Sequence, residues 1–338
     1  MENKTTIALA VTLLLLSVGS LFIGVVPLDI FGLMGGNFKQ TEILLLSRFP
    51  RLLAILCTGA GMSTAGLIMQ QLCFNKFVSP STGATIASAQ FGILLAMLVF
   101  PSSTLLHKAA FSFASAIAGT WIFIFFVQRI KFKDVIMVPL VGIMFGNIIG
   151  GVTEYLSYRY GLMQALSSWL VGDFSLIIQG RYEMVFLCLP MIILAFIYAN
   201  HFNIVGLGEH FSKNLGVNYS MILFFGLSIA AVITASVVVI VGAIPYIGLI
   251  IPNIVSMFKG DNIRGTLADT AITGALFVLV CDIIGRLVIF PYEIPVNLII
   301  GVAGSVIFIG LLFRRLSTGN KSPVKIPGKN SGQGRQPE

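Results

Sequence analysis

The sequence has very little charge. Charged residues make up 10% of its 338 residues, whereas hydrophobic residues make up 57%. A soluble domain carries about 25% charged residues, so this chain has too little polar surface for a soluble fold. The composition therefore predicts a membrane protein that crosses the bilayer several times.

The sequence also lacks the motifs of an enzyme or a metal site. It has no Gly-x-x-x-x-Gly-Lys-Ser/Thr phosphate loop, and its three histidines lie in separate predicted loops. The four cysteines show no Cys-x-x-Cys spacing, which indicates small buried hydrophobic residues. We therefore predict no catalytic residue, cofactor or metal. Asp282 is the only carboxylate deep in a predicted helix, so a separate ATPase is favoured over an ion gradient as the energy source.

What the sequence has instead is a series of long apolar runs. A helix needs about 20 apolar residues to cross the hydrocarbon core. We expect an all-α membrane protein with about ten transmembrane helices, at 7–26, 52–74, within 77–106, 109–127, 135–153, 184–199, two within 214–258, 266–286 and 294–313. Gly242, Pro245 and Gly248 divide the uncharged stretch 214–258 into a seventh helix and a shorter eighth helix that contains Pro252.

The distribution of lysine and arginine predicts the orientation. With both termini in the cytoplasm, the inner segments hold 14 of the 21 Lys and Arg residues, as the positive-inside rule requires. We therefore expect cytoplasmic N and C termini. Residues 1–315 form the expected transmembrane domain, and residues 316–338, rich in Gly, Pro, Lys and Ser, are predicted to be a disordered cytoplasmic tail.

Four motifs, at residues 48–51, 75–80, 248–253 and 281–286, together resemble those of the permease subunits of type II ATP-binding cassette (ABC) importers, the vitamin B12 and iron-siderophore family. Residues 48–51 (Arg-Phe-Pro-Arg) match the Arg-x-Pro-Arg motif before the family's second helix. Residues 248–253 match its Gly-Leu-x-x-Pro-His block with Asn253 in place of the histidine, and residues 281–286 match its Ala-Asp-x-x-Ala-Arg block at Asp282 and Arg286, with Cys281 and Gly285 in place of the alanines. Its Asn-Pro-Leu-Ala-x-Pro turn is matched only at Asn75 and Pro80. The resemblance extends to about Arg315 and is strongest for the branch associated with catecholate siderophores.

This resemblance implies a permease that moves a ferric siderophore into the cytoplasm by alternating access, in the bacterial cytoplasmic membrane. The implied partners are two cytoplasmic ATPase subunits, an extracytoplasmic substrate-binding lipoprotein and a second permease, with a heterodimer favoured over a homodimer. Asn253 and Ser256 replace the family's common His and Arg, which is compatible with a non-identical partner. No nucleic acid is implied. The alternatives are haem or cobalamin as cargo, a stand-alone secondary carrier, and a membrane receptor or scaffold.

Three arginines are candidates for docking the substrate-binding protein. By resemblance, Arg48, Arg51 and Arg286 face the extracytoplasmic side and receive glutamates from the two lobes of that protein. The alternative is structural. In that case Arg48 and Arg51 reach to the membrane interface, and Arg286 pairs with Asp282 four residues earlier on its own helix.

The loop between the sixth and seventh predicted helices resembles the family's coupling loop, which packs two short helices against the ATPase. Its candidate coupling residues are Gly208, Glu209, Phe211, Leu215 and Gly216. We expect Gly216 to adopt a positive φ where the chain turns back into the membrane. An ordinary solvated connector is the alternative.

The resemblance implies that the fifth and tenth predicted helices line the translocation path, and polar residues there and in the turn after the second helix are candidates for the path or its gate. They are Asn75, Ser79, Pro80, Asn147, Thr153, Asn297 and Ser305. Gly142, Gly146 and Gly150 lie four residues apart around Asn147. This spacing of small residues is also typical of plain helix packing. A weakly polar, uncharged lining suits a bulky solute that passes without binding tightly.

Overall fold

The computed structural model describes residues 2–26, 38–129, 137–180 and 182–319. Within these ranges it contains helices, turns and two isolated β-bridges but no strand, which confirms the predicted all-α class. The helices are α1 (Glu2–Phe22), α3 (Phe38–Ile43), the π-helical turn η1 (Leu44–Arg48), α4 (Phe49–Leu72), α5 (Thr85–Val99), α6 (Leu105–Arg129), α7 (Met137–Arg159), α8 (Met163–Leu170), the 3-10 turn η2 (Glu183–Leu187), α9 (Cys188–Ile197), α10 (Ala199–Val205), α11 (Glu209–Asn214), α12 (Tyr219–Ile240), α13 (Ile247–Lys259), α14 (Ile263–Leu287) and α15 (Val296–Gly319).

The apolar helices fall into three groups by length. Six helical segments are long and apolar enough to cross a membrane, and they contain α1, α4, α6, α7, α12 and α14. A seventh consists of η2–α9 and α10, which are bent by 62° relative to each other. The helices α5, α13 and the apolar part of α15 are shorter. The break between α12 and α13 falls at residues 241–246, within the region predicted from Gly242, Pro245 and Gly248, and Pro252 lies inside α13.

Several predicted helix ends are wrong. The first helix covers residues 2–22 instead of 7–26, the helix containing 52–74 begins at residue 38, and the fifth helix continues from 153 to 159. The last helix includes 316–319, which the sequence assigns to the disordered tail, while 320–338 lie outside the described residues. Hydropathy marks only the apolar run, whereas helical hydrogen bonding continues into the polar residues that flank it.

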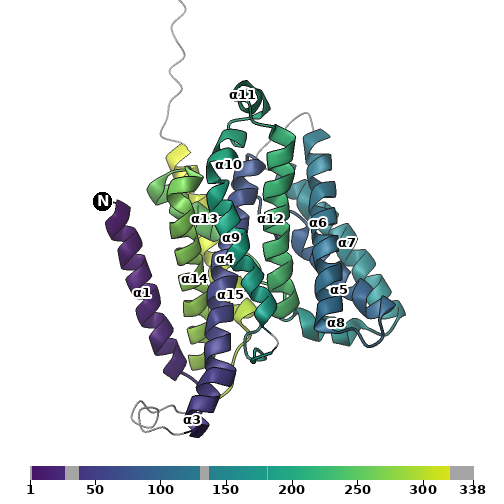
Figure 1. The fold of residues 1–338 in the computed structure, drawn as a ribbon, viewed down its shortest axis with the longest axis vertical. Coiled ribbons are helices and arrows are strands. Elements are labelled where there is room, and N and C mark those ends of the chain that lie inside the picture. The colour runs from purple at the N-terminus through teal and green to yellow at the C-terminus, as the bar shows by residue number, and fades with distance from the viewer. Residues whose placement is uncertain (1, 27–37, 130–136, 181, 320–338) are drawn as a thin grey trace, which may run out of the picture.

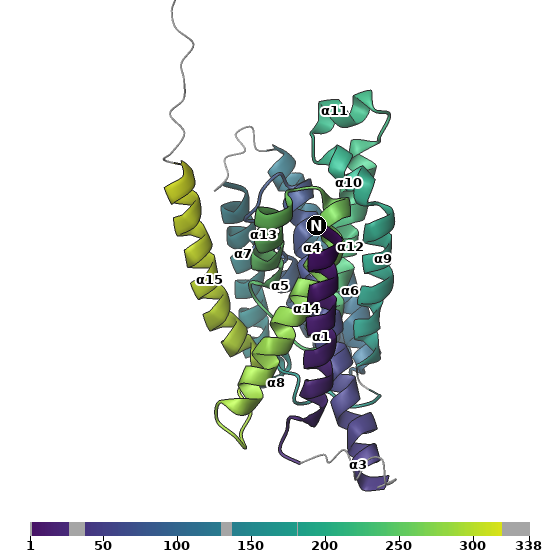
Figure 2. The same cartoon turned by 90° about the vertical axis from the view of Figure 1, so that its left-hand side faces the viewer.

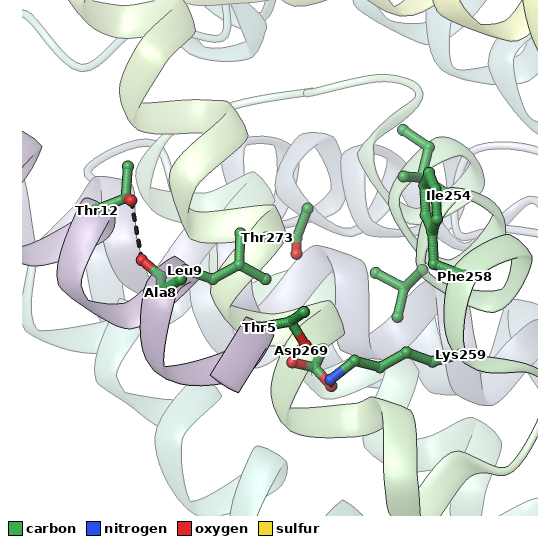
Figure 3. A pocket seen from close by; sticks show the side chains of 10 residues that line it. Thr5, Ala8, Leu9, Thr12, Ile254, Phe258, Lys259, Asp269 and Thr273 are labelled. Carbon is green, nitrogen blue, oxygen red and sulfur yellow. Dashed lines mark hydrogen bonds and ion pairs between the residues drawn. The ribbon is translucent and has the colours of Figure 1, made fainter. Parts of the chain in front are cut away.

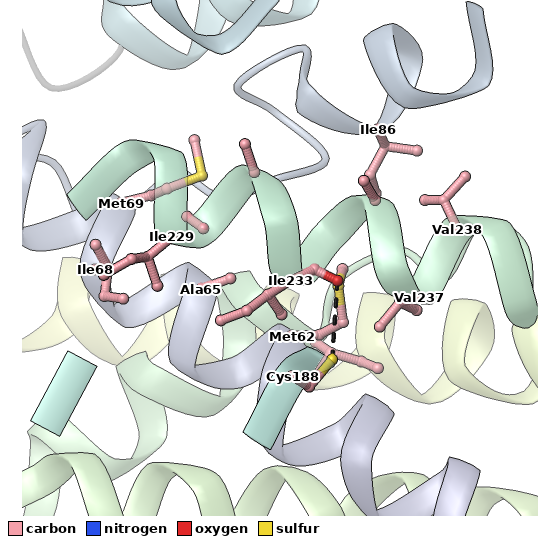
Figure 4. Close-up of a cluster of buried hydrophobic side chains, with 14 of the residues drawn as sticks. Met62, Ala65, Ile68, Met69, Ile86, Cys188, Ile229, Ile233, Val237 and Val238 are labelled. Carbon is pink, nitrogen blue, oxygen red and sulfur yellow. Dashed lines mark hydrogen bonds between the residues drawn. The ribbon is translucent and has the colours of Figure 1, made fainter. Parts of the chain in front are cut away.

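The core is built around α4 and α12. Over an apolar 18-residue stretch of the spans that contain them, 83% and 78% of residues are buried, compared with 11% over such a stretch of α1. Met62, Ala65 and Ile68 of α4 lie opposite Ile229 and Ile233 of α12 (Figure 4). The helices α1 and α15 lie at the edge of the bundle (Figures 1 and 2).

Glycines bring α13 and α14 into backbone contact with α4. A Cβ atom on Gly66 would lie 1.9 Å from the carbonyl oxygen of Gly248 in α13. A Cβ atom on Gly59 would lie 2.4 Å from the carbonyl oxygen of Gly274 in α14. Such close helix crossings are typical of membrane bundles. In a bilayer the hydrophobic effect does not drive helices together, so small residues that allow close van der Waals packing favour their association.

Different helices lie at the two ends of the bundle. The start of α1, the end of α15 and α11 lie toward one end, here called the α11 end (Figure 1). The opposite end, here called the α3 end, carries α3, α8 and the last turn of α14 (Figure 2). The start of the first described helix and the end of the last one therefore lie toward the same end of the bundle.

Candidate functional site

The three predicted docking arginines meet at the α3 end. Arg51, in the first turn of α4, places Nη2 2.7 Å from Oδ1 of Asp282 and Nη1 2.7 Å from Oε2 of Glu293. Arg286, in the last turn of α14, contacts the other carboxylate oxygen of Asp282. Asp282 therefore bridges two arginines. Together with Arg48, the set has three cations and two carboxylates, and we call these five residues the arginine cluster.

The arginine cluster also holds the end of α1. Nη1 of Arg286 donates to the carbonyl oxygens of Ser20 and Ile23, both at 3.0 Å, and its Nη2 donates to Oγ of Ser20 at 2.5 Å. Arg48 donates to the carbonyl oxygens of Ile23 and Val26, the latter at 2.9 Å. Ser20 lies in the last turn of α1, and Ile23 and Val26 follow that helix, so these guanidinium groups hold the chain where it leaves α1.

The three arginines differ in their access to solvent. Arg286 is 4% exposed and forms the intrahelical pair with Asp282 that the sequence leaves open as the structural alternative. The side chain of Arg51 is 13% exposed, whereas Arg48 is half-buried. Docking by these residues stays a prediction. Sequence reasoning missed Glu293 as a partner of Arg51, because hydropathy does not indicate which cation a loop carboxylate meets.

At the α11 end, the predicted coupling segment forms two short helices, α10 and α11. Gly216 has a φ of +73°, as the sequence predicts, and Gly208 has a φ of +110°. Ser212 fastens the two helices together because its Oγ donates to the carbonyl oxygens of Gly208 and Ile204, at 2.8 and 3.2 Å. Side chains at the two glycines would be strained by the positive φ alone.

Three apolar side chains of this segment point away from the bundle. Leu207, Phe211 and Leu215 are 62%, 61% and 58% exposed, and we call them the α11 surface. Glu209 and Lys213 form an exposed ion pair beside them, with 2.8 Å between Oε1 and Nζ. An apolar group on a projecting helix is typical of a protein contact site.

The predicted gate residues Asn75, Ser79 and Pro80 are buried together in residues 73–84, here called the α4–α5 turn. Oδ1 of Asn75 accepts from the backbone of Phe77 at 2.9 Å, a bond that stabilises a tight turn. Asn253 of α13 donates from Nδ2 to the carbonyl oxygen of Lys76 at 2.7 Å. The asparagine that replaces the family's histidine therefore fastens α13 to this turn within one chain.

The remaining path candidates are spread over α7 and α15. Asn147 is exposed, and the hydroxyls of Thr153 and Ser305 donate to carbonyl oxygens of their own helices at 2.7 Å. Oδ1 of Asn297 is buried and has no hydrogen-bond partner within the described ranges. The role of these four residues in transport stays a prediction.

The small residues of α7 pack closely only at one end of the helix. A Cβ atom on Gly142 would lie 1.9 Å from the carbonyl oxygen of Thr82, and one on Gly146 would lie 3.6 Å from Ala84. Gly150 has nothing within 4 Å of that position. Plain packing therefore accounts for Gly142, whereas Gly150 and the exposed Asn147 lie on an open face of α7.

A buried carboxylate that the sequence did not single out lies between α1, α13 and α14. Asp269 pairs with Nζ of Lys259 at 2.5 Å and accepts from the hydroxyl of Thr6 at 2.8 Å. Both charged residues line a mostly apolar groove of about 650 Å³, together with Leu9 and Phe258 (Figure 3). Asp269 lies close to the first residue of the predicted helix 266–286, so hydropathy could not show that its side chain is buried.

The sequence matches the FecCD transport family over residues 9–314. The chain belongs to this family. It is 47% identical over 310 residues to the petrobactin import system permease protein YclN of Bacillus subtilis (strain 168), covering 91% of this chain and 97% of that protein. It is 37% identical over 295 residues to the ferric-anguibactin transport system permease protein FatD of Vibrio anguillarum, covering 87% and 94%.

The fold has a counterpart among solved structures. An inward-facing structure of a metal-chelate type ABC transporter matches with a TM-score of 0.79 at 24% identity, over 92% of this chain and 99% of the other. This likeness shows a shared fold. The family members are permease subunits of ABC importers, which are transport components and not enzymes, as the sequence predicts.

Proposed function

We propose that this chain is the transmembrane permease subunit of an ABC importer that moves a ferric siderophore into the cytoplasm. The observation that carries the proposal is 47% identity, over 97% of its length, to a protein named as a petrobactin import permease. A second relative is named for anguibactin transport. The cargo we assign is a ferric siderophore of the catecholate type, in preference to haem or cobalamin.

The proposed topology has ten crossings in the bacterial cytoplasmic membrane, with both termini and α11 in the cytoplasm. Six long spans, one bent span and three shorter apolar helices support this number. The excess of Lys and Arg in the segments that would then be cytoplasmic supports the orientation. The arginine cluster would consequently lie on the extracytoplasmic side.

The two ends would bind different partners. The α11 surface fits a cytoplasmic ATPase, because aromatic and aliphatic side chains held on a rigid short helix are suited to fill a protein cleft. The arginine cluster has one more cation than carboxylate, so it would attract acidic side chains of a substrate-binding lipoprotein. Each permease would bind one ATPase subunit, giving two ATPases in the dimeric importer.

For the second permease we propose a non-identical subunit. The relatives' names do not distinguish this from a homodimer. The hydrogen bond from Asn253 to Lys76 removes one argument for a heterodimer, because Asn253 already has a hydrogen-bond partner within this chain. Uptake should be tested with this permease, its ATPase and its binding protein, with and without a second permease. Full uptake with this chain as the only permease would refute the heterodimer.

The function itself is tested by reconstitution. Proteoliposomes containing the complete importer should accumulate radiolabelled ferric petrobactin only when ATP and the binding protein are present. Haem and cyanocobalamin serve as competing cargoes and should not reduce that uptake. Uptake driven by a proton or sodium gradient without ATP would show a secondary carrier. A fall in ferric petrobactin uptake when haem or cyanocobalamin is added would change the assigned cargo.

A further inference from the structure

Three segments that are distant in sequence meet at the α11 end. They are the α4–α5 turn, α10, and residues 260–262 between α13 and α14. They surround a cavity of about 580 Å³, whose lining includes Gln71, Lys76, Asn203, Gly206, Asp261 and Asn262. Most of the side chains that line this cavity are polar, although Phe74, Ile204 and Leu207 also line it, so hydrogen bonds and charges contribute to how the segments fit together.

Asn203 joins α10 to the start of α14. Its Nδ2 donates to Oδ1 of Asn262 at 2.8 Å, and its Oδ1 accepts from the backbone of Ile263 at 3.0 Å. Asn262 is the N-cap of α14 and accepts from the backbone of Arg264 at 3.1 Å. The first amides of a helix need acceptors from outside it, so Asn203 completes the cap of α14 from a different helix.

Residue 261 then joins the start of α14 to the α4–α5 turn. Oδ1 of Asp261 lies 2.6 Å from Nζ of Lys76, and the two side chains are 65% and 25% exposed. Ion pairs with this exposure are individually weak, so such a contact can break and re-form without a large barrier. The carbonyl oxygen of Lys76 is held by Asn253, which connects the same residue to α13.

The backbone of α10 also lies directly against α4. A Cβ atom on Gly206 would lie 2.1 Å from Nε2 of Gln71. On the outer side, Ser212 links α11 to the carbonyl oxygen of Ile204. A displacement of α11 would therefore be passed to α10, and α10 has contacts with both the cap of α14 and the end of α4.

We propose that Lys76 and Asp261 form a latch that holds the α4–α5 turn closed, and that Asn203 links this latch to the movement of α10 and α11. This inference rests on the proposed function, because it assigns positioning residues to the transport cycle. The latch is closed in the structure described here. ATP-driven movement of α11 shifts the start of α14 through Asn203, separates Asp261 from Lys76 and releases the turn that contains Asn75 and Pro80.

Charge reversal tests the latch. Lys76→Asp and Asp261→Lys should each reduce ATP-dependent uptake of ferric petrobactin by about fivefold or more while ATP hydrolysis continues, because a typical coupling between sites has this size. The double variant Lys76→Asp/Asp261→Lys restores the opposite charges and should recover most of the uptake. Arg264→Glu, an equally large charge change at an exposed neighbouring residue, is the matched control. Additive losses in the double variant would overturn the proposal.

Cross-linking tests the movement independently of uptake. Lys76→Cys and Asp261→Cys are combined, with the two single variants as controls; the four native cysteines are buried. The disulfide should form in the nucleotide-free complex and should form about fivefold more slowly when the ATPase is trapped with ATP and vanadate. Equal rates in the two states would overturn the latch. A wild-type complex that hydrolyses ATP but takes up no ferric petrobactin would refute the proposed cargo, and the cross-linking comparison would still decide the latch.

Discussion

The two ends of this bundle use charged and apolar side chains in opposite ways. At the α3 end, the guanidinium groups of Arg51 and Arg286 are turned inward, onto Asp282, Glu293 and the last carbonyls of α1. At the α11 end, the three apolar side chains of the α11 surface are more than half exposed. At the α3 end buried charges hold the helices together, whereas at the α11 end apolar side chains stay uncovered and the ion pairs Glu209–Lys213 and Lys76–Asp261 are more exposed.

This difference separates residues that maintain the fold from residues that are free to meet a partner. Removing one member of a buried ion network leaves the others without compensation, so the cost falls on folding. Substitution of an exposed side chain on a short projecting helix has little effect on stability. Variants at the α3 end should therefore show mixed effects on folding and binding, while variants at the α11 end should affect transport alone.

The largest effect is expected for Asp282→Ala. It would leave Arg51 and Arg286 near each other without their shared carboxylate, and loss of one partner in a buried charge pair costs about 3 to 5 kcal/mol. We expect a strongly lowered melting temperature of the purified permease in detergent. Asp261→Ala removes an exposed carboxylate at the other end and should leave the melting temperature nearly unchanged. Equal melting temperatures for the two variants would contradict the division between the ends.

Arg48→Glu should weaken association with the binding protein while the permease still folds, because Arg48 is the most accessible of the three arginines. Losing a charge pair at an interface costs about 2 to 5 kcal/mol, which corresponds to a roughly 30-fold or greater loss of affinity. Titration of the purified complex with the binding protein at low salt measures this loss. Arg159→Glu, with the same charge change at an exposed residue, is the control.

A Glu→Arg change on the binding protein should partly restore association with the Arg48→Glu permease. Unchanged affinity of the Arg48→Glu permease would show that the arginine serves only to hold the end of α1. Arg51→Glu is a less direct probe, since it places a third carboxylate beside Asp282 and Glu293 and disturbs the fold as well.

Gly216→Val should reduce uptake while binding-protein association and ATP hydrolysis persist. The positive φ of Gly216 makes a β-branched residue there unfavourable by about 1 to 2 kcal/mol, so the turn into α12 would shift. Gly265→Val is the matched control, since neither glycine has a neighbour near the new Cβ position and Gly265 has a helical φ. Wild-type uptake by a well-expressed Gly216→Val complex would exclude a role for this turn in coupling.

The smallest effect on stability is expected for Glu209→Gln. Exposed ion pairs four residues apart on a helix contribute about 0.3 to 0.5 kcal/mol, so melting should change little. Uptake should nevertheless fall, because the same residue lies beside the α11 surface that we assign to the ATPase. A matched melting and uptake experiment with Lys213→Gln checks whether the ion pair or Glu209 itself is responsible. A loss of uptake in both variants would assign the effect to the pair.

Features that depend on residues close together in the sequence could be predicted from it. The apolar runs predicted where the helices lie, although not where several of them end, because burial in a membrane requires continuous apolar stretches. The break between α12 and α13 followed from Gly242 and Pro245, and the positive φ of Gly216 followed from the turn that a glycine permits. The family motif at residues 48–51 also indicated where charged residues matter, although it did not show which groups they contact.

Contacts between distant segments were decided only by the tertiary structure. Arg51 and Glu293 are 242 positions apart, Thr6 and Asp269 are 263 apart, and Asn253 meets Lys76 across 177 positions. Hydropathy and turn propensity describe each helix separately, whereas these pairs depend on how glycines such as Gly59 and Gly66 let α13 and α14 approach α4. The sequence thus determined the helices and their breaks, and the packing of the bundle determined which polar groups became partners, because a buried charge or amide must bond to whatever the crossing helices bring within reach.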